Sequence, residues 1–177
     1  EITPGNFKKR VAFGLSGSSS VDGAIKAARC YTGRSKIVSF LRSYHGTTYG
    51  ALSVSGYGVE MRKDIYPLVP DVEFIPYPDC YRCMFEKEYP SCGLTCFKHL
   101  ETLTSTVVDK EDIAAVIIEP IQGDAGIIIP PMEYYKKLIQ FCKENKILII
   151  ADEVQTGFGR TGKMFASEHF GLEPDII

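Results

Sequence analysis

The feature that most constrains the fold is a pair of apolar runs that each lead into an acid. Residues 113–118 read IAAVII and precede Glu119, and residues 147–150 read ILII and precede Ala151 and Asp152. Neither run alternates between apolar and polar residues, which is typical of strands buried on both faces of a parallel sheet. Because a buried carboxylate is costly without a cationic partner, Asp152 either caps a turn or holds a positively charged group.

Strand-like and helix-like stretches alternate along most of the chain. Besides the two runs above, short apolar stretches predict strands at 11–13, 36–41 and 72–75. Apolar residues and turn signals predict helices over 20–32, 50–55, 96–105, 132–145 and 165–170. This alternation predicts an α/β fold, with a mostly parallel, doubly wound sheet that carries helices on both faces.

Composition narrows the class of protein. With 177 residues, 45% hydrophobic and 24% charged, the chain can bury one sizeable core, and no repeat or linker marks a boundary within residues 1–177. A net charge of −2 with interspersed signs argues against nucleic-acid and membrane partners, and we expect a cytoplasmic protein. Because the chain lacks an initiating Met and ends as a strand begins, we expect it to be part of a longer protein.

Polar residues and glycines follow several of the expected strands. Taken singly, each has an ordinary structural explanation, as a helix cap, a packed aromatic corner or a strand-end acid. In open α/β sheets, however, ligands bind outside the carboxyl ends of the strands. We therefore expect one rim to gather Gly17, Ser18, Tyr44, His45, Glu119, Asp152 and Gln155.

The residue types at this rim describe a ligand. The serine loop before the helix over 20–32 suits a phosphate, since free N–H groups at a helix N-terminus attract anions. Tyr44 offers a flat face to a ring, and Asp152 suits a basic ring nitrogen, whose protonated form a nearby carboxylate favours. These features together fit pyridoxal phosphate, a cofactor whose protonated ring withdraws electrons from the reacting carbon of a substrate.

Four motifs resemble those of the class III, fold-type-I pyridoxal-phosphate-dependent aminotransferases, near the 4-aminobutyrate aminotransferases. They cover nearly the whole chain, and the last is the most specific: SGSSSVDGAIKAAR, SYHGTTYGALSVSG, EPIQGDAG and ADEVQTGFGRTGKMFASEHFGLEPDII. The resemblance implies that Gly17 and Ser18 bind the cofactor phosphate and that Tyr44 stacks on the pyridine ring. It also implies that Val154 packs against the other ring face and that Gln155 reaches the phenolic oxygen.

The same resemblance implies the catalytic groups. Asp152 would pair with the ring nitrogen, and Glu119 and His45 would lie close to the ring, so the catalytic residues expected here are Asp152 and Glu119. The Schiff-base lysine of the family would lie beyond Ile177, and Lys163 does not match its position. The chain would then be part of a large, cofactor-binding domain, without the lysine and the small domain. The parent would be a homodimer whose second subunit completes the phosphate site.

The resemblance implies a transaminase acting on amino and 2-oxo acids, with 4-aminobutyrate or another omega-amino acid as the donor. Two departures leave the reaction open. Ser19, Ser20 and Val21 differ from the usual residues after the glycine loop, and Asp124 stands where 4-aminobutyrate enzymes tend to carry Glu. The second departure fits an amino-acid racemase or epimerase of the same family. A nucleotide-binding domain and a non-catalytic fragment are further alternatives, although no GxGxxG or GxxxxGK[ST] motif is present.

The cysteines form a separate pattern. A CxxC and a CxxxC, made by Cys80, Cys83, Cys92 and Cys96, have spacings that predict either a structural zinc site or a set of unligated thiols. Disulfides are not expected in a cytosolic protein. Cys30 and Cys142 fall on helix faces, where we expect them in the core.

Overall fold

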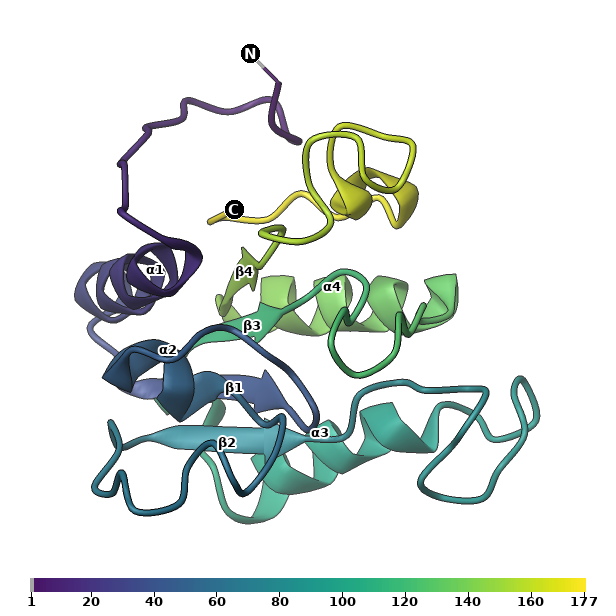
Figure 1. The fold of residues 1–177 in the computed structure, drawn as a ribbon. Helices are drawn as coiled ribbons and strands as arrows, with labels where there is room; N and C mark the ends of the chain where they lie inside the picture. Colours follow the sequence, from purple (N-terminus) through teal and green to yellow (C-terminus); the bar gives the residue numbers. More distant parts are fainter. Residues whose placement is uncertain (1) are drawn as a thin grey trace.

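The computed structural model describes residues 2–177 and contains one parallel sheet of four strands, in the order β2-β1-β3-β4 (Figure 1). The strands are β1 (Lys36–Phe40), β2 (Val72–Ile75), β3 (Ile113–Ile118) and β4 (Leu148–Ala151). The helices are α1 (Gly17–Thr32), α2 (Tyr49–Val54), α3 (Thr95–Thr106) and α4 (Met132–Asn145), with short 3₁₀ helices η1 (Lys110–Asp112) and η2 (Ala166–His169). The predicted α/β fold with a parallel sheet is confirmed.

The sheet is buried on both faces, as its unbroken apolar runs predict. On one face, Ile37, Ile117 and Ile150 pack against α1 and α2, and on the other, Val116 and Ile149 pack against α3 and α4 (Figure 1). Successive side chains of a strand point to opposite faces, so both sets must be apolar when both faces are covered. The helices on the two faces of the sheet are therefore explained by the same residues that predicted the strands.

The strand expected at 11–13 is wrong. These residues have no regular structure, and the Phe13 side chain is 98% exposed. The N-terminal segment runs outside the sheet before it enters α1 (Figure 1). Three apolar residues can form a strand only when a neighbouring strand accepts their backbone hydrogen bonds, and this segment lies beside none within the described residues.

Two further expectations concern the cysteines on helices. Cys142 is buried on α4, as expected, but Cys30 is exposed on α1, contrary to expectation. The buried stripe of α1 runs through Val21, Ile25 and Ala28. Because these positions fall at i, i+4 and i+7 on one face, Cys30 lies outside the stripe.

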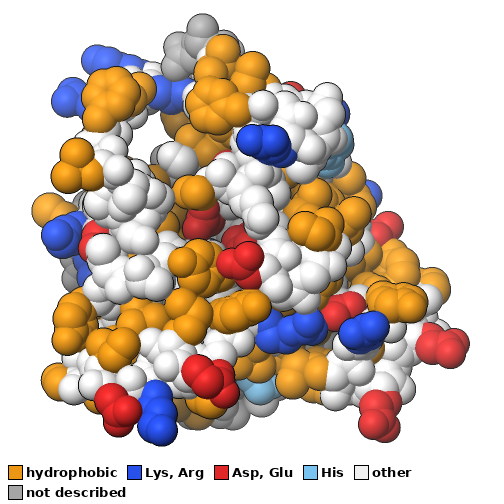
Figure 2. Space-filling model, in the orientation of Figure 1, with side chains coloured by type: hydrophobic (Ala, Val, Ile, Leu, Met, Phe, Trp, Pro, Cys, Tyr) orange, Lys and Arg blue, Asp and Glu red, His pale blue; other side chains and the backbone are white. Residues whose placement is uncertain are grey.

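The strand expected to begin near the end of the chain is seen as a single parallel bridge between Ile176 and Ile150. Ala151 N–H donates to the Ile176 carbonyl at 2.9 Å, beside β4. Within residues 2–177, no helix has the length and apolarity needed to cross a bilayer. Figure 2 shows acidic and basic side chains dispersed among apolar ones, without a continuous basic patch on the face drawn.

Candidate functional site

Residues that follow β1, β3 and β4 line one cavity of about 340 Å³. The strand after β1 in sequence, β2, lies on one side of β1, and β3 lies on the other, so the winding direction reverses between β1 and β3 (Figure 1). Ligands of open α/β sheets bind at such a reversal. The volume falls within the range of small-molecule sites, roughly 300–1,000 Å³.

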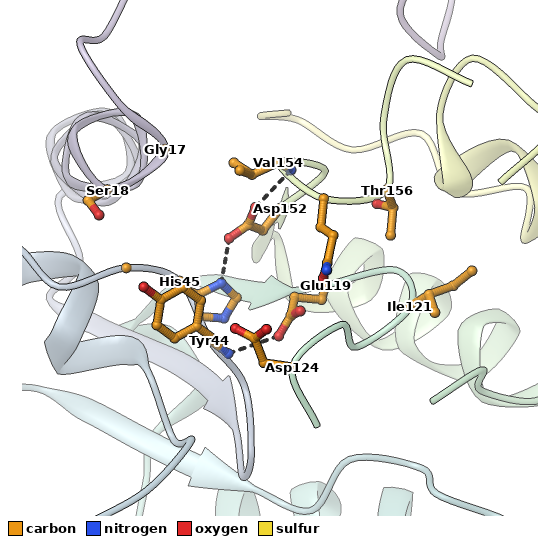
Figure 3. A pocket seen from close by; sticks show the side chains of 12 residues that line it. Gly17, Ser18, Tyr44, His45, Glu119, Ile121, Asp124, Asp152, Val154 and Thr156 are labelled. Carbon is orange, nitrogen blue, oxygen red and sulfur yellow. Dashed lines mark hydrogen bonds and ion pairs between the residues drawn. The ribbon is translucent and has the colours of Figure 1, made fainter. Parts of the chain in front are cut away.

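The structure brings the expected rim residues together around this cavity (Figure 3): Gly17, Ser18, Tyr44, His45, Glu119, Asp152, Val154 and Gln155. Gly17 and Ser18 do not follow a strand, contrary to expectation. They reach the rim because α1 begins there, after Ser16, whose hydroxyl accepts the Ser19 N–H. The first N–H groups of a helix have no intrahelical acceptor, so this end of α1 attracts an anion.

Asp152 and His45 form a buried pair at the cavity. The distance between His45 Nδ1 and Asp152 Oδ2 is 2.7 Å, and the two side chains are 0% and 6% exposed. The other carboxylate oxygen, Asp152 Oδ1, accepts the Val154 N–H at 3.1 Å, and the Asp152 N–H donates to the Ile118 carbonyl. The carboxylate is thus held by its own turn and by the loop after β1, and the Asp152 backbone is held by β3.

Glu119 connects two walls of the cavity. Its carboxylate accepts the backbone N–H of Tyr44 at one oxygen and that of Gly123 at the other, both at 2.9 Å. Burial raises the pKa of Glu119 above its ordinary value, although the bond from Gly123 and the nearby His45 ring oppose this effect. Glu119 therefore holds the loop after β1 against the loop after β3.

Glycines let the walls approach closely. A Cβ atom at Gly17 would lie 3.1 Å from both methyl carbons of Val154, and one at Gly123 would overlap the side-chain oxygen of Gln155. Gly46 has φ +123°, a conformation that other residues rarely adopt, and a Cβ there would overlap the Ser18 hydroxyl. Three contacts around the cavity thus depend on the absence of a side chain.

The aromatic wall is formed by Tyr44, whose ring meets Tyr57 edge to face at a centroid distance of 6.2 Å. Sequence reasoning missed three residues that line the cavity: Gly46, Ile121 and Thr156. Gly46 directly follows His45, so its position offered a signal. Thr156 likewise directly follows Gln155, whereas Ile121 carried no such signal, because its side chain meets the cavity only through the course of the loop after β3. Asp124, singled out as a departure from the family pattern, also lines the cavity.

Of the two alternatives for the cysteines, the zinc site is not supported. Cys80, Cys83, Cys92 and Cys96 line a small cavity of about 20 Å³, but no group of three or more His, Cys, Asp or Glu residues within 2–177 is arranged to hold a metal ion. Burial, together with the neighbouring thiols Cys80 and Cys92, raises the pKa of Cys96 to about 11. The thiol form of Cys96 is therefore favoured at neutral pH.

The family follows from comparison of the whole chain. A model of the class-III aminotransferases matches residues 1–177. The chain belongs to the class-III aminotransferase family. This result confirms the resemblance that the four sequence motifs indicated.

Proteins with different activities resemble this chain. It is 50% identical to a leucine/methionine racemase of Thermococcus litoralis, over 100% of this chain and 40% of that protein. It is 38% identical to a 4-aminobutyrate aminotransferase of Mycobacterium leprae, over 99% of this chain and 40% of that protein. The chain therefore spans about 40% of the length of these curated relatives.

A solved structure supports the same fold. An amine transaminase from an uncultivated Pseudomonas species, in a form with bound pyridoxal phosphate, superposes with a TM-score of 0.84 and 37% identity. The match covers 90% of this chain and 37% of the transaminase. The four-stranded parallel sheet and its flanking helices thus match the corresponding part of this transaminase.

Proposed function

We propose that the parent protein is a pyridoxal-phosphate-dependent amino-acid racemase or epimerase. The observation that carries this proposal is the buried Asp152–His45 pair at the cavity, in a chain 50% identical to a racemase. The aminotransferase expected from the motifs is the second candidate, because an aminotransferase is also similar, at 38% identity. Because the chain spans about 40% of these relatives, either activity is proposed for the longer parent protein and not for this chain by itself.

The residues present fit the cofactor. The N-terminus of α1, at Gly17 and Ser18, offers N–H groups to a phosphate, and Gly46 leaves room beside it. Tyr44 provides an aromatic wall and Val154 an exposed apolar side chain at the same cavity. Asp152 supplies the carboxylate that a pyridine nitrogen requires to stay protonated.

The Asp152 carboxylate would hold a proton at the ring nitrogen, and His45 would keep that carboxylate in place through its 2.7 Å contact. When bound, pyridoxal phosphate supplies an electron-withdrawing ring that stabilises negative charge at the α-carbon of an amino acid. Glu119 would keep Tyr44 against the cavity through its bond to the Tyr44 N–H. These three residues would therefore bind and orient groups, and the amine that bonds to the cofactor would come from outside this chain.

Asp124 bears on the choice between the two reactions. Racemisation returns a proton to the same carbon, whereas transamination moves the amino group to a second substrate, a 2-oxo acid. The 4-aminobutyrate enzymes that the motifs resemble tend to carry a longer acid where this chain has Asp124, an exposed cavity residue. The shorter side chain agrees with the racemase reading.

The test is an assay with one amino acid and no 2-oxo acid. The purified parent protein, loaded with pyridoxal phosphate, is incubated with L-leucine or L-methionine, and the two enantiomers are separated by chiral chromatography. Appearance of the D-isomer without loss of total amino acid supports racemisation. Consumption of amino acid only after a 2-oxo acid is added identifies an aminotransferase instead, and no conversion in either assay contradicts both.

The expected homodimer and the cytoplasmic location stay proposals. Sedimentation of the purified parent protein checks the first, and fractionation of the cells that make it checks the second. A monomer that retains full activity would contradict the shared site expected from the resemblance.

A further inference from the structure

Glu153, the residue after Asp152, is a buried carboxylate that lies outside the cavity. It is 8% exposed, and its backbone carbonyl accepts the Gly157 N–H at 2.8 Å. Glu153 is absent from the residues that line the cavity, but Val154, Gln155 and Thr156, which follow it, all line the cavity. These three residues form one wall of the cavity, and the turn that contains them begins at Glu153.

All four bonds to the Glu153 side chain are donated to it. Oε2 accepts the Thr156 hydroxyl and the Ala166 N–H, the latter at 3.0 Å. Oε1 accepts the N–H and the hydroxyl of Ser167, both at 2.7 Å. Because each oxygen accepts a backbone N–H, an amide at this position would direct its NH₂ group at one of these two donors.

These bonds join the cavity wall to η2, thirteen residues away along the chain. Thr156 is buried, lines the cavity and donates to Glu153, while Ala166 and Ser167 are fully buried in the body of the protein. Hydrogen bonds on the side away from the cavity thus attach the turn over 153–157 to η2. On the cavity side, the same turn contacts two other segments. Val154 packs against Gly17 of α1, and the Gln155 side chain packs against Gly123 in the loop after β3.

We propose that Glu153 is a positioning residue, which holds Val154 and Gln155 at the cofactor through Thr156 and the turn. This inference rests on the proposed function, because it is there that Val154 and Gln155 face the cofactor. Glu153 itself touches neither substrate nor cofactor. Its effect is exerted through the shape of the turn over 153–157.

The test compares Glu153→Gln with Glu168→Gln in the full-length protein. Glu168 lies in η2, the short helix that Glu153 contacts. Its Oε1 accepts a single hydrogen bond, from the Phe165 N–H at 2.8 Å, which an amide oxygen can also accept. We expect Glu153→Gln to weaken pyridoxal phosphate binding about tenfold, because buried donors lose their acceptor. Amide hydrogen exchange over 154–157 should also rise in the cofactor-free protein. Glu168→Gln should change neither quantity.

A second pair of variants tests the proposal if the Glu153→Gln protein does not fold. Thr156→Val removes one donor, and Thr156→Ser retains it, so the serine variant should bind pyridoxal phosphate more tightly than the valine variant. A Glu153→Gln protein that melts at a lower temperature but keeps the wild-type cofactor affinity and exchange over 154–157 would overturn the proposal. If the wild type binds no pyridoxal phosphate, the proposed function fails, and the exchange measurement still tests the positioning of the turn.

Discussion

At the scale of single residues, the cavity depends on groups that orient other groups. His45 contacts Asp152 and is fully buried, and its second ring nitrogen, Nε2, has no hydrogen-bond partner within residues 2–177. Both carboxylate oxygens of Glu119 accept hydrogen bonds from backbone N–H groups. Neither residue can be replaced by an apolar one without leaving a buried polar partner unsatisfied.

We predict that His45→Phe weakens binding of pyridoxal phosphate about tenfold, because the Asp152 carboxylate loses a charge-assisted hydrogen bond and its fixed orientation. His45→Asn places an amide N–H near the position of Nδ1 and should keep most of the affinity. Titration of the cofactor-free protein by absorbance measures both. Equal affinities for the two variants would show that the contact with Asp152 does not matter.

The pH dependence of stability tests Glu119. Its pKa in the folded protein is raised above 4.5 by burial, so between 4.5 and the raised value the folded state binds more protons than the unfolded state. The free energy of unfolding must then fall as pH rises through this window. Glu119→Gln cannot titrate and should lack this fall, apart from a constant loss for one missing acceptor. Urea titrations of both proteins across pH measure the difference, and parallel curves would contradict it.

At the scale of elements, most helices and strands follow from local patterns. The helix over 132–145 has the same bounds in the structure, because it begins after Pro131 and its apolar residues recur on one face. The helix expected over 20–32 begins earlier, at Gly17, because Ser16 and Ser19 form a capping box. That capping also places the first turn of α1 at the cavity.

Two glycines of α1 should differ in their response to alanine. Gly23 has open space where a Cβ would lie, so Gly23→Ala should raise the free energy of unfolding by about 0.5–1 kcal/mol. At Gly17 a Cβ would press on Val154 at 3.1 Å, so Gly17→Ala should gain less stability and should weaken cofactor binding. Thermal unfolding and a cofactor titration of each variant provide the comparison. Tighter cofactor binding by Gly17→Ala would refute the assignment of this contact.

At the scale of the whole molecule, one core layer between the sheet, α3 and α4 contains two fully buried tyrosines, Tyr134 and Tyr135. The Tyr135 hydroxyl donates to the Pro120 carbonyl at 2.8 Å, whereas the Tyr134 hydroxyl has no partner within residues 2–177. Burial raises the pKa of both phenols, which are therefore neutral at physiological pH. The two buried side chains therefore differ in one respect: the Tyr135 hydroxyl has a hydrogen-bond acceptor and the Tyr134 hydroxyl has none within residues 2–177.

We predict that Tyr134→Phe is neutral or stabilises the protein by about 1 kcal/mol, because it removes an unsatisfied buried hydroxyl. Tyr135→Phe should destabilise it by about 1 kcal/mol, because the Pro120 carbonyl loses its shorter hydrogen bond and keeps only the one from the Tyr77 hydroxyl at 3.4 Å. Chemical denaturation of the two variants beside the wild type checks the sign. Similar destabilisation by both changes would indicate that the Tyr134 hydroxyl is satisfied in solution.

The sequence by itself determined the local elements and the residue types at the rim. Unbroken apolar runs such as 113–118 are typical of strands in a covered parallel sheet, and acids at their ends then lie at its carboxyl edge. The tertiary structure alone decided the order β2-β1-β3-β4, the exposure of residues 11–13 and the place of Thr156 and Glu153. These features depend on contacts between residues far apart in the chain, which no local spacing encodes.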